Sequence, residues 1–201
     1  MRTYINLKIK TMKLKVGLPF AFVLALGLVA CNSNKGLSVE DQGEVLIEQY
    51  CSGDEYFSDK NTFRGNAIGE SLDQMTAKKK ARSNTQAEIA KTISSTMKIV
   101  GDNYVSSSEF NNKEEVTETF NEMSRTIVDE QLQGVVTICE KMTKTADGKY
   151  KCYMAMEIAA EKLASKYHER LSKDEKLRAD YNYEKFKETF EKEMERMSNG
   201  Y

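Results

Sequence analysis

The sequence predicts an α+β fold in which long helices pack on a small antiparallel sheet, followed by a helical C-terminal extension. Three observations predict it. Apolar residues recur at spacings of three and four in residues 72–97 and 113–132, as in amphipathic helices. Two apolar segments, 135–143 and 149–158, flank a turn that contains glycine, as in a β-hairpin. After residue 158 the apolar positions follow a helical period again.

The first thirty residues are predicted to be an export signal outside this fold. Five basic residues and no acidic residue precede an uncharged apolar stretch from Val16 to Ala30, and this order is typical of secretory signals. A permanent membrane span is the weaker alternative, because a spanning helix needs roughly 20 apolar residues. Met12 begins an equally good signal, so translation from Met1 and from Met12 both stay open.

The signal ends in a short aliphatic run followed by a cysteine: Leu28, Val29, Ala30 and Cys31. This run resembles the lipobox of bacterial lipoproteins. The resemblance implies that residues 1–30 are removed and that the sulfur of Cys31 carries a lipid, with residues 31–38 as a polar tether. Two or three acyl chains, such as palmitate, hold a protein durably on a membrane. Asn32 is not aspartate, which by the enterobacterial sorting rule implies the outer membrane. The alternative is an ordinary secretory signal with a chance cysteine.

The exported chain is acidic and carries no basic stripe. Without the five basic residues of the signal, 25 of the 30 Lys and Arg remain against 31 Asp and Glu, a net charge of −6. A phosphate backbone is bound by clustered cations, so nucleic acid is not an expected partner. About 170 residues suit one domain with a core of its own. We therefore predict a single exported domain over residues 39–201.

Three cysteines follow Cys31, namely Cys51, Cys139 and Cys152. Disulfides form outside the cytoplasm, but three cysteines leave at least one without an intramolecular partner. Their spacing matches neither a metal site nor a redox motif. Whether Cys51 or Cys139 forms a disulfide is left open by the sequence.

The segment before the first long helix is predicted to be mostly short extended pieces. Residues Gly43–Cys51 are compatible with a strand or a short helix, and the aliphatic cluster after Gly43 favours a strand. Residues 52–60 are turn-like. Residues Thr62–Ile68 are expected to form a short strand, weakened by a glycine.

Ser71 is predicted to cap a helix over Leu72–Met97, with Gln74 completing a capping box. Its expected core positions are Leu72, Met75, Ile89, Ile93 and Met97, and its expected small face is Ala77 and Ala81. The adjacent lysines Lys78, Lys79 and Lys80 point in three directions on a helix, so a solvated surface is favoured over a membrane or nucleic-acid site. Residues 101–112 are expected to form a loop.

A second helix is predicted from about Lys113 to Leu132, with a core stripe at Val116, Phe120, Met123 and Ile127. The hairpin follows, closed by Ala146, Asp147 and Gly148. Closure with glycine in the left-handed conformation places Met142 opposite Cys152, Ile138 opposite Met156 and Val136 opposite Ile158. In this register Cys139 lies opposite Ala155 and points away from Cys152, which is expected to be a small core residue.

The extension is expected to be helical from about Ile158. Leu163 and Tyr167 share one face before Leu171, and Ser172–Glu175 is a capping box for a last helix. The apolar stripe of that helix is Tyr183, Phe186, Phe190, Met194 and Met197. Packing on the same domain is favoured over binding of a partner helix.

No reactive constellation is evident, and we predict a protein that is not an enzyme and has no cofactor. His168 is the single histidine and lies in a highly charged segment, so a surface role is favoured over general-base chemistry or metal binding. Residues 64–69 have two glycines at the wrong spacing for a phosphate loop.

Two segments resemble the lipoprotein-20 family of bacterial lipoproteins. The first is Arg64–Ser71 followed by a helix with Ala77, Ala81 and Glu88–Ala90, and the second is the hairpin with Asp147–Tyr150 and Tyr153–Met156. The resemblance covers roughly residues 60–160 and implies a long helix on an antiparallel sheet, tethered to the outer membrane, without catalytic residues.

The leading functional hypothesis is a lipid-anchored, non-enzymatic lipoprotein that binds or assembles with another envelope protein. The alternative is a domain that binds a small molecule or glycan in a site between the sheet and a helix.

Overall fold

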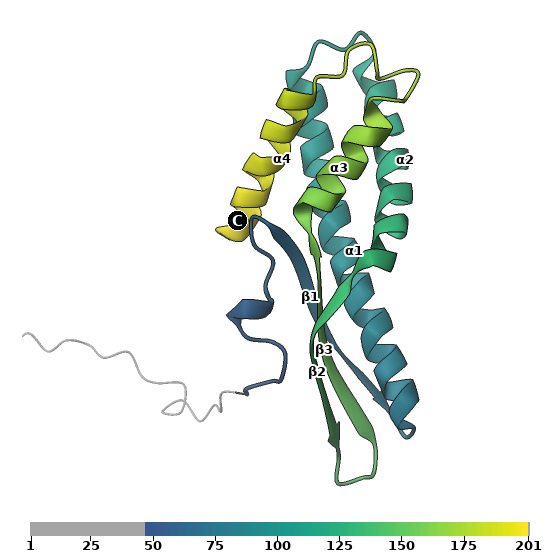
Figure 1. Cartoon of the computed structure of the whole chain (residues 1–201), viewed down its shortest axis with the longest axis vertical. Helices are drawn as coiled ribbons and strands as arrows, with labels where there is room; N and C mark the ends of the chain where they lie inside the picture. Colours follow the sequence, from purple (N-terminus) through teal and green to yellow (C-terminus); the bar gives the residue numbers. More distant parts are fainter. Residues whose placement is uncertain (1–46, 201) are drawn as a thin grey trace, which may run out of the picture. The chain divides into compact units, whose positions relative to one another are not determined.

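The computed structural model describes residues 47–200, and the predicted signal and tether lie outside this range. The described part is α+β, as predicted, with four helices and one three-stranded antiparallel sheet (Figure 1). The elements in chain order are η2 (Asp54–Tyr56), β1 (Thr62–Ser71), α1 (Gln74–Ser107), α2 (Lys113–Gln131), η3 (Leu132–Gly134), β2 (Val136–Lys144), β3 (Tyr150–Ala159), α3 (Ala160–Leu171) and α4 (Tyr183–Ser198).

The three strands lie in the order β1-β3-β2, so the hairpin of β2 and β3 is extended by the earlier strand β1. The predicted register is confirmed at Met142 opposite Cys152 and at Cys139 opposite Ala155. A bulge between Thr137 and Cys139 then inserts one extra residue, so Val136 lies opposite Glu157 and not Ile158. The predicted pairing of Ile138 with Met156 is wrong for the same reason.

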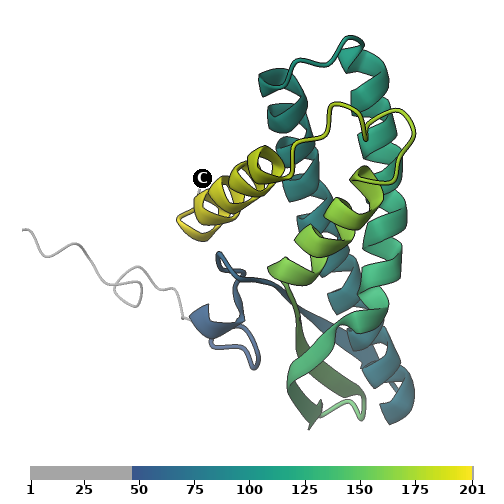
Figure 2. The ribbon, with the colours of Figure 1, turned by 45° about the horizontal axis from the view of Figure 1, so that its top comes forward.

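Helix α1 covers one face of the sheet along its first half and continues past the sheet to pack against α2 and α4 (Figures 1 and 2). Its N-cap is Asp73, whose side chain accepts a hydrogen bond from the backbone N–H of Thr76 at 2.7 Å. The predicted cap, Ser71, is the last residue of β1 instead. The strand continues three residues beyond Ile68, the predicted end, because it pairs with β3 as far as Tyr150.

The predicted loop over residues 101–112 is confirmed for residues 108–112 but is wrong for residues 101–107, because α1 continues to Ser107. Glycine lowers helix propensity, but Gly101 is required by packing. A Cβ atom at Gly101 would lie 2.5 Å from the ring of Phe120 in α2. The glycine therefore marks a close approach between two helices and not the end of one.

The buried face of α1 differs from the predicted one at its start. Leu72 and Met75 were expected in the core, but they are 74% and 59% exposed. The buried positions follow a spacing of four through Ala77, Ala81, Thr85, Ile89 and Ile93. Small residues occupy the first turns because the helix lies directly on the sheet there.

The close approach of α1 to β1 depends on Gly69. A Cβ atom at this position would lie 2.2 Å from the carbonyl oxygen of Ala77 and 2.2 Å from the backbone nitrogen of Ala81. Thr85 lies one turn further on, fully buried, and its hydroxyl donates to the carbonyl oxygens of Ala81 and Met154. The described interface between this helix and the sheet is therefore filled by direct contacts.

The upper part of the domain is a helical layer with an aromatic core. Helix α2 matches its prediction, although Met123 is only half-buried. Tyr167 of α3 stacks against both Phe120 and Phe186, with ring centroids 5.6 and 6.2 Å away. Phe186, Phe190 and Met194 of α4 are buried, which confirms that this stripe packs on its own domain, whereas Tyr183 is exposed.

Three predicted boundaries need correction. Ser172–Glu175 does not start a helix, because the Asp174 carboxylate caps a turn by accepting from the backbone N–H groups of Lys176 and Leu177. Helix α4 begins later, at Tyr183, with Asn182 as its N-cap. Ile158 belongs to β3, and the helical extension begins at Ala160.

Residues Gly43–Cys51 were expected to form a strand or a short helix. Residues 47–51 form neither, and the rest of this segment lies outside the described residues. The buried hydrophobic side chains of the described residues extend from Cys51 to Met194. Residues 47–200 also form one compact unit by their contacts, so the domain contains a core of its own.

Candidate functional site

The first feature of the site is a disulfide between Cys51 and Cys139, which lie 88 residues apart in the sequence. Cys139 projects from β2 on the face of the sheet away from α1, as its register predicts. Cys51 has a φ of 57°, the left-handed region that side chains other than glycine rarely adopt. The disulfide therefore fastens the start of the described chain to the sheet.

Cys152 takes no part in this pairing. It is fully buried and free, as predicted for a core residue. Burial is the main cause that raises the pKa of its thiol above the ordinary value. A thiol in an apolar interior is a poor nucleophile because the thiolate is disfavoured there.

An ionic clamp continues from the disulfide and holds residues 57–61 against the sheet. The Arg64 guanidinium contacts Asp59 at 2.7 Å and Glu157 at 2.9 Å, and the Ser58 hydroxyl bonds both backbone groups of Arg64. Partial burial alone would raise the pKa of Asp59. The Asn61 backbone N–H and the Arg64 guanidinium together lower it below 3.8. The clamp thus fixes a loop beside the start of α3.

This loop forms one end of a groove between α3 and α4. The Asn61 carbonyl oxygen accepts from the backbone N–H of Ala160 at 2.8 Å, which joins the loop to α3. The groove has a volume of about 530 Å³. Its lining includes an apolar set, Ala160, Ala164, Tyr183, Phe186 and Phe190, and a charged set, Lys60, Glu161, Lys187 and Glu191.

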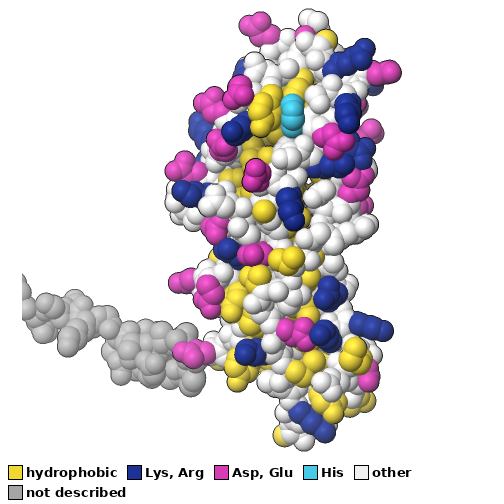
Figure 3. Space-filling model, viewed as in Figure 1, with side chains coloured by type: hydrophobic (Ala, Val, Ile, Leu, Met, Phe, Trp, Pro, Cys, Tyr) yellow, Lys and Arg dark blue, Asp and Glu magenta, His cyan; other side chains and the backbone are white. Residues whose placement is uncertain are grey.

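The groove is lined by α3 on one side and by α4 on the other. Figure 2 shows the two helices lying side by side with their axes in similar directions, and the loop before β1 below them. Figure 3 shows apolar surface beside the histidine in the same part of the molecule. An apolar floor between charged rims is typical of a surface that receives another apolar segment.

His168 lies next to this groove and is held in an aromatic cluster. Its Nδ1 lies 3.1 Å from the hydroxyl of Tyr181, and its ring centroid lies 4.2 Å from that of Tyr183. It is half-buried and not fully exposed as the surface prediction implied. Burial raises the pKa of Tyr181 well above its usual value, so the phenol stays protonated.

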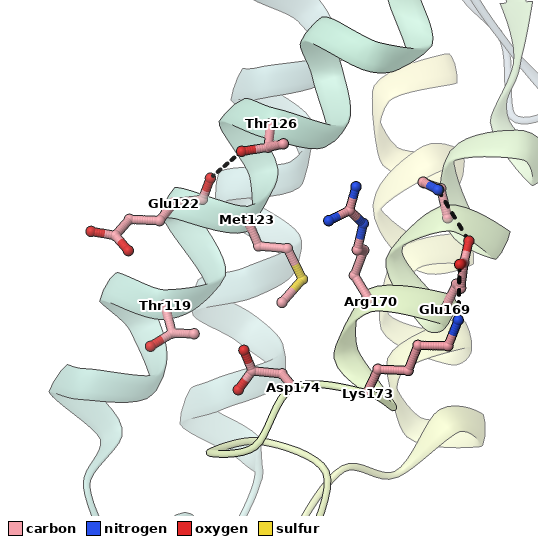
Figure 4. Close-up of a pocket in the computed structure, with 9 residues that line it drawn as sticks. Thr119, Glu122, Met123, Thr126, Glu169, Arg170, Lys173 and Asp174 are labelled. Atoms are coloured by element: carbon pink, nitrogen blue, oxygen red, sulfur yellow. Dashed lines mark hydrogen bonds and ion pairs between the residues drawn. The ribbon is translucent and has the colours of Figure 1, made fainter.

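A second, open pocket of about 560 Å³ lies between α2 and α3 (Figure 4). Its cations already have partners. Arg170 and Lys166 both contact Glu130, and Lys173 contacts Glu169 at 3.0 Å. Lys173 and then Lys166 lower the pKa of Glu169. The pocket is therefore lined by a surface network of ion pairs. Among the described residues that line it, no nucleophile is hydrogen-bonded to a base.

The predicted site residues Leu28, Val29, Ala30 and Cys31 lie outside the described residues. Within residues 47–200 there is no group of three or more potential metal ligands, and no helix there is long and apolar enough to cross a membrane. Sequence reasoning missed the groove, because α3 and α4 are separated by a turn whose path no local pattern encodes. The sequence offered one signal of the groove, namely Tyr183 as the first residue of the apolar stripe of the last helix.

No protein-family model matches this chain, and no curated protein is similar enough to count as a relative. The resemblance to the lipoprotein-20 family therefore stays a prediction.

Proposed function

We propose that this chain is a lipid-anchored lipoprotein of the bacterial cell envelope, not an enzyme, which binds another envelope protein through the groove between α3 and α4. The Cys51–Cys139 disulfide is the observation that carries the proposal. Stable disulfides are formed mainly outside the cytoplasm. This supports export of the domain, which is what the signal and lipobox before it predict.

The groove supports the binding part of the proposal. Ala164 lacks bulk and is only half-buried, so a partner segment can approach α3 closely, while the exposed Tyr183 supplies a large apolar contact from α4. The rim carries Lys60 and Lys187 as well as Glu161 and Glu191. An amphipathic segment with charges of both signs beside its apolar face fits this arrangement.

Site-specific photo-crosslinking in intact cells tests the proposal. A photoreactive amino acid replaces Ala164 in the groove, and the matched control replaces Ser94, an exposed residue on α1. We expect a discrete protein adduct in the envelope fraction from position 164 and none from position 94. Adducts that are absent from position 164, or that are the same from both positions, would contradict binding at the groove.

A further inference from the structure

The end of the domain opposite the groove combines exposed apolar residues with an excess of positive charge. We define the hairpin end as residues 68–82, from late β1 into α1, and residues 140–154, from late β2 into β3. The two segments are joined by the pairing of Ser71 with Tyr150 and by the ion pair of Lys78 with Glu140 at 2.7 Å. Figures 1 and 2 show both segments at the same end of the molecule.

The charge of this end is opposite to that of the rest of the domain. The hairpin end contains eight basic and four acidic residues, a net charge of +4. The other described residues contain 16 basic and 24 acidic residues, a net charge of −8. The chain looked evenly mixed along the sequence because its basic residues are gathered only when α1 and the hairpin come together.

The acidic groups of the hairpin end are already neutralised locally. Glu70 contacts Lys149 and Lys151, Asp147 contacts Lys149, and Glu140 contacts Lys78. The fourth acidic residue caps α1. Five cations of this end make no ion pair within the described residues, namely Lys79, Lys80, Arg82, Lys141 and Lys144.

Two apolar side chains project from the same end. Leu72 and Met75 were expected in the core, yet both are largely exposed at the turn between β1 and α1. Lys79 and Arg82 follow Met75 at spacings of four and seven on α1, so they share its side of the helix. Figure 3 shows basic and apolar side chains side by side at this end.

We propose that the hairpin end docks on an anionic lipid surface. Leu72 and Met75 enter the headgroup region, and the surrounding lysines and arginine contact lipid phosphates. Interfacial binding by a few apolar side chains ringed by cations follows this physics, with about 1 kcal/mol contributed by each basic residue near an anionic surface. None of the pockets described above includes a residue of this end, and a convex basic tip suits a deformable bilayer better than a rigid protein partner.

This inference rests on the proposed function in one respect, because the anchor at Cys31 would hold the domain beside a membrane. Sixteen positions separate Cys31 from Ile47, and such a chain reaches at most roughly 55 Å. The disulfide fastens the chain to Cys139 in β2. Cys139 lies six residues before Thr145 at the start of the hairpin turn, which is a distance of about 20 Å along an extended strand. The tether is thus long enough for the hairpin end to contact the membrane that holds the anchor.

The test uses residues 32–201 without lipid, because residues 47–200 contain a complete core and the disulfide. Co-sedimentation is measured with vesicles of phosphatidylcholine and phosphatidylglycerol, and with vesicles of phosphatidylcholine alone. We expect binding to the anionic vesicles only. Reversing two charges with Lys79→Glu and Lys144→Glu should weaken it at least tenfold, and Leu72→Ser with Met75→Ser should weaken it severalfold.

The matched control is Lys91→Glu with Lys98→Glu, which makes the same charge change further along α1, where neither lysine forms an ion pair with another described residue. It should retain binding within about twofold, since these positions lie outside the hairpin end. Circular dichroism and the disulfide content of each variant establish that it is folded.

Equal binding to both kinds of vesicle, or equal losses in control and tip variants, would overturn the proposal. So would binding of polyglutamate by the hairpin end without binding of vesicles, because that result would identify an acidic protein partner. The test protein, residues 32–201, carries no lipid. If it does not bind vesicles, the lipid anchor at Cys31 is not called into question. If Cys31 is found not to be lipidated in cells, the vesicle result remains valid.

Discussion

Removing the disulfide should cost this domain a large share of its stability. The bond between Cys51 and Cys139 closes a loop of 88 residues, and the chain-entropy relation gives about 4.5 kcal/mol for such a loop at 25 °C. The left-handed backbone of Cys51 offsets about 1 kcal/mol of this, because the strain is released when the bond is absent. We expect the double variant Cys51→Ser, Cys139→Ser to lose about 3–4 kcal/mol of unfolding free energy.

Urea denaturation followed by circular dichroism, without reductant, measures this loss. Under reductant the unmodified protein should unfold at the same urea concentration as the double variant, because both then lack the Cys51–Cys139 bond, and Cys152, the third cysteine of the described residues, is free in both. A loss below about 1 kcal/mol would refute the loop-closure reasoning. A further loss when reductant is added to the double variant would also refute it, since that variant has no described disulfide left.

Three other substitutions test the packing and the clamp. Gly69→Ala should lower the free energy of unfolding by at least about 2 kcal/mol, since its Cβ would meet the backbone of α1; Gly134→Ala, whose Cβ meets nothing within 4 Å, is the control for thermal melting. Glu193→Met should raise the unfolding free energy by about 1 kcal/mol, because Glu193 is buried and its Oε1 has no hydrogen-bond partner. Asp59→Asn should lower the melting temperature near neutral pH. The pKa of Asp59 in the folded protein lies below 3.8, the ordinary value, so protonation in acid removes the stabilisation that its charge supplies. The difference between the variant and the unmodified protein should therefore vanish as the pH falls below 3.8.

For each of these three substitutions, one result would contradict the prediction. Equal melting of the two glycine variants would mean that α1 does not lie as close to β1 as described. A destabilised methionine variant would mean that the ion pair between Glu193 and Arg196 contributes more to stability than burial of the unpartnered Oε1 costs. A difference at Asp59 that persists in strong acid would mean that the side chain acts through packing and not through its charge.

The fold class and most elements follow from local patterns in the sequence. The hairpin register was predictable because the turn with Gly148 and the alternation of Met142, Cys152 and Met154 require the same pairing. The bulge at Ile138 was not, because nothing local marks an inserted residue. The cap at Asp73 was missed because Ser71 has equal capping chemistry, and only its pairing with Tyr150 in the sheet decides between them.

The features that local patterns did not predict depend on long-range packing. Gly101 looks like a helix terminator until Phe120 is placed against it. The pairing of Cys51 with Cys139 depends on where residues 47–61 lie on the sheet, which no periodicity encodes. The hairpin end likewise exists only in three dimensions, because its two basic segments are about 70 residues apart in the sequence.

Mass spectrometry of the protein purified from membranes tests directly whether Cys31 is lipidated. We expect an N-terminus at Cys31, with the mass of a diacylglyceryl group on its sulfur, and a Cys51–Cys139 disulfide in the same molecule. We also expect Cys31→Ser to leave an unlipidated chain that still contains the disulfide. A membrane form that begins at Met1 or Met12, or a processed form without lipid on Cys31, would contradict the lipoprotein assignment.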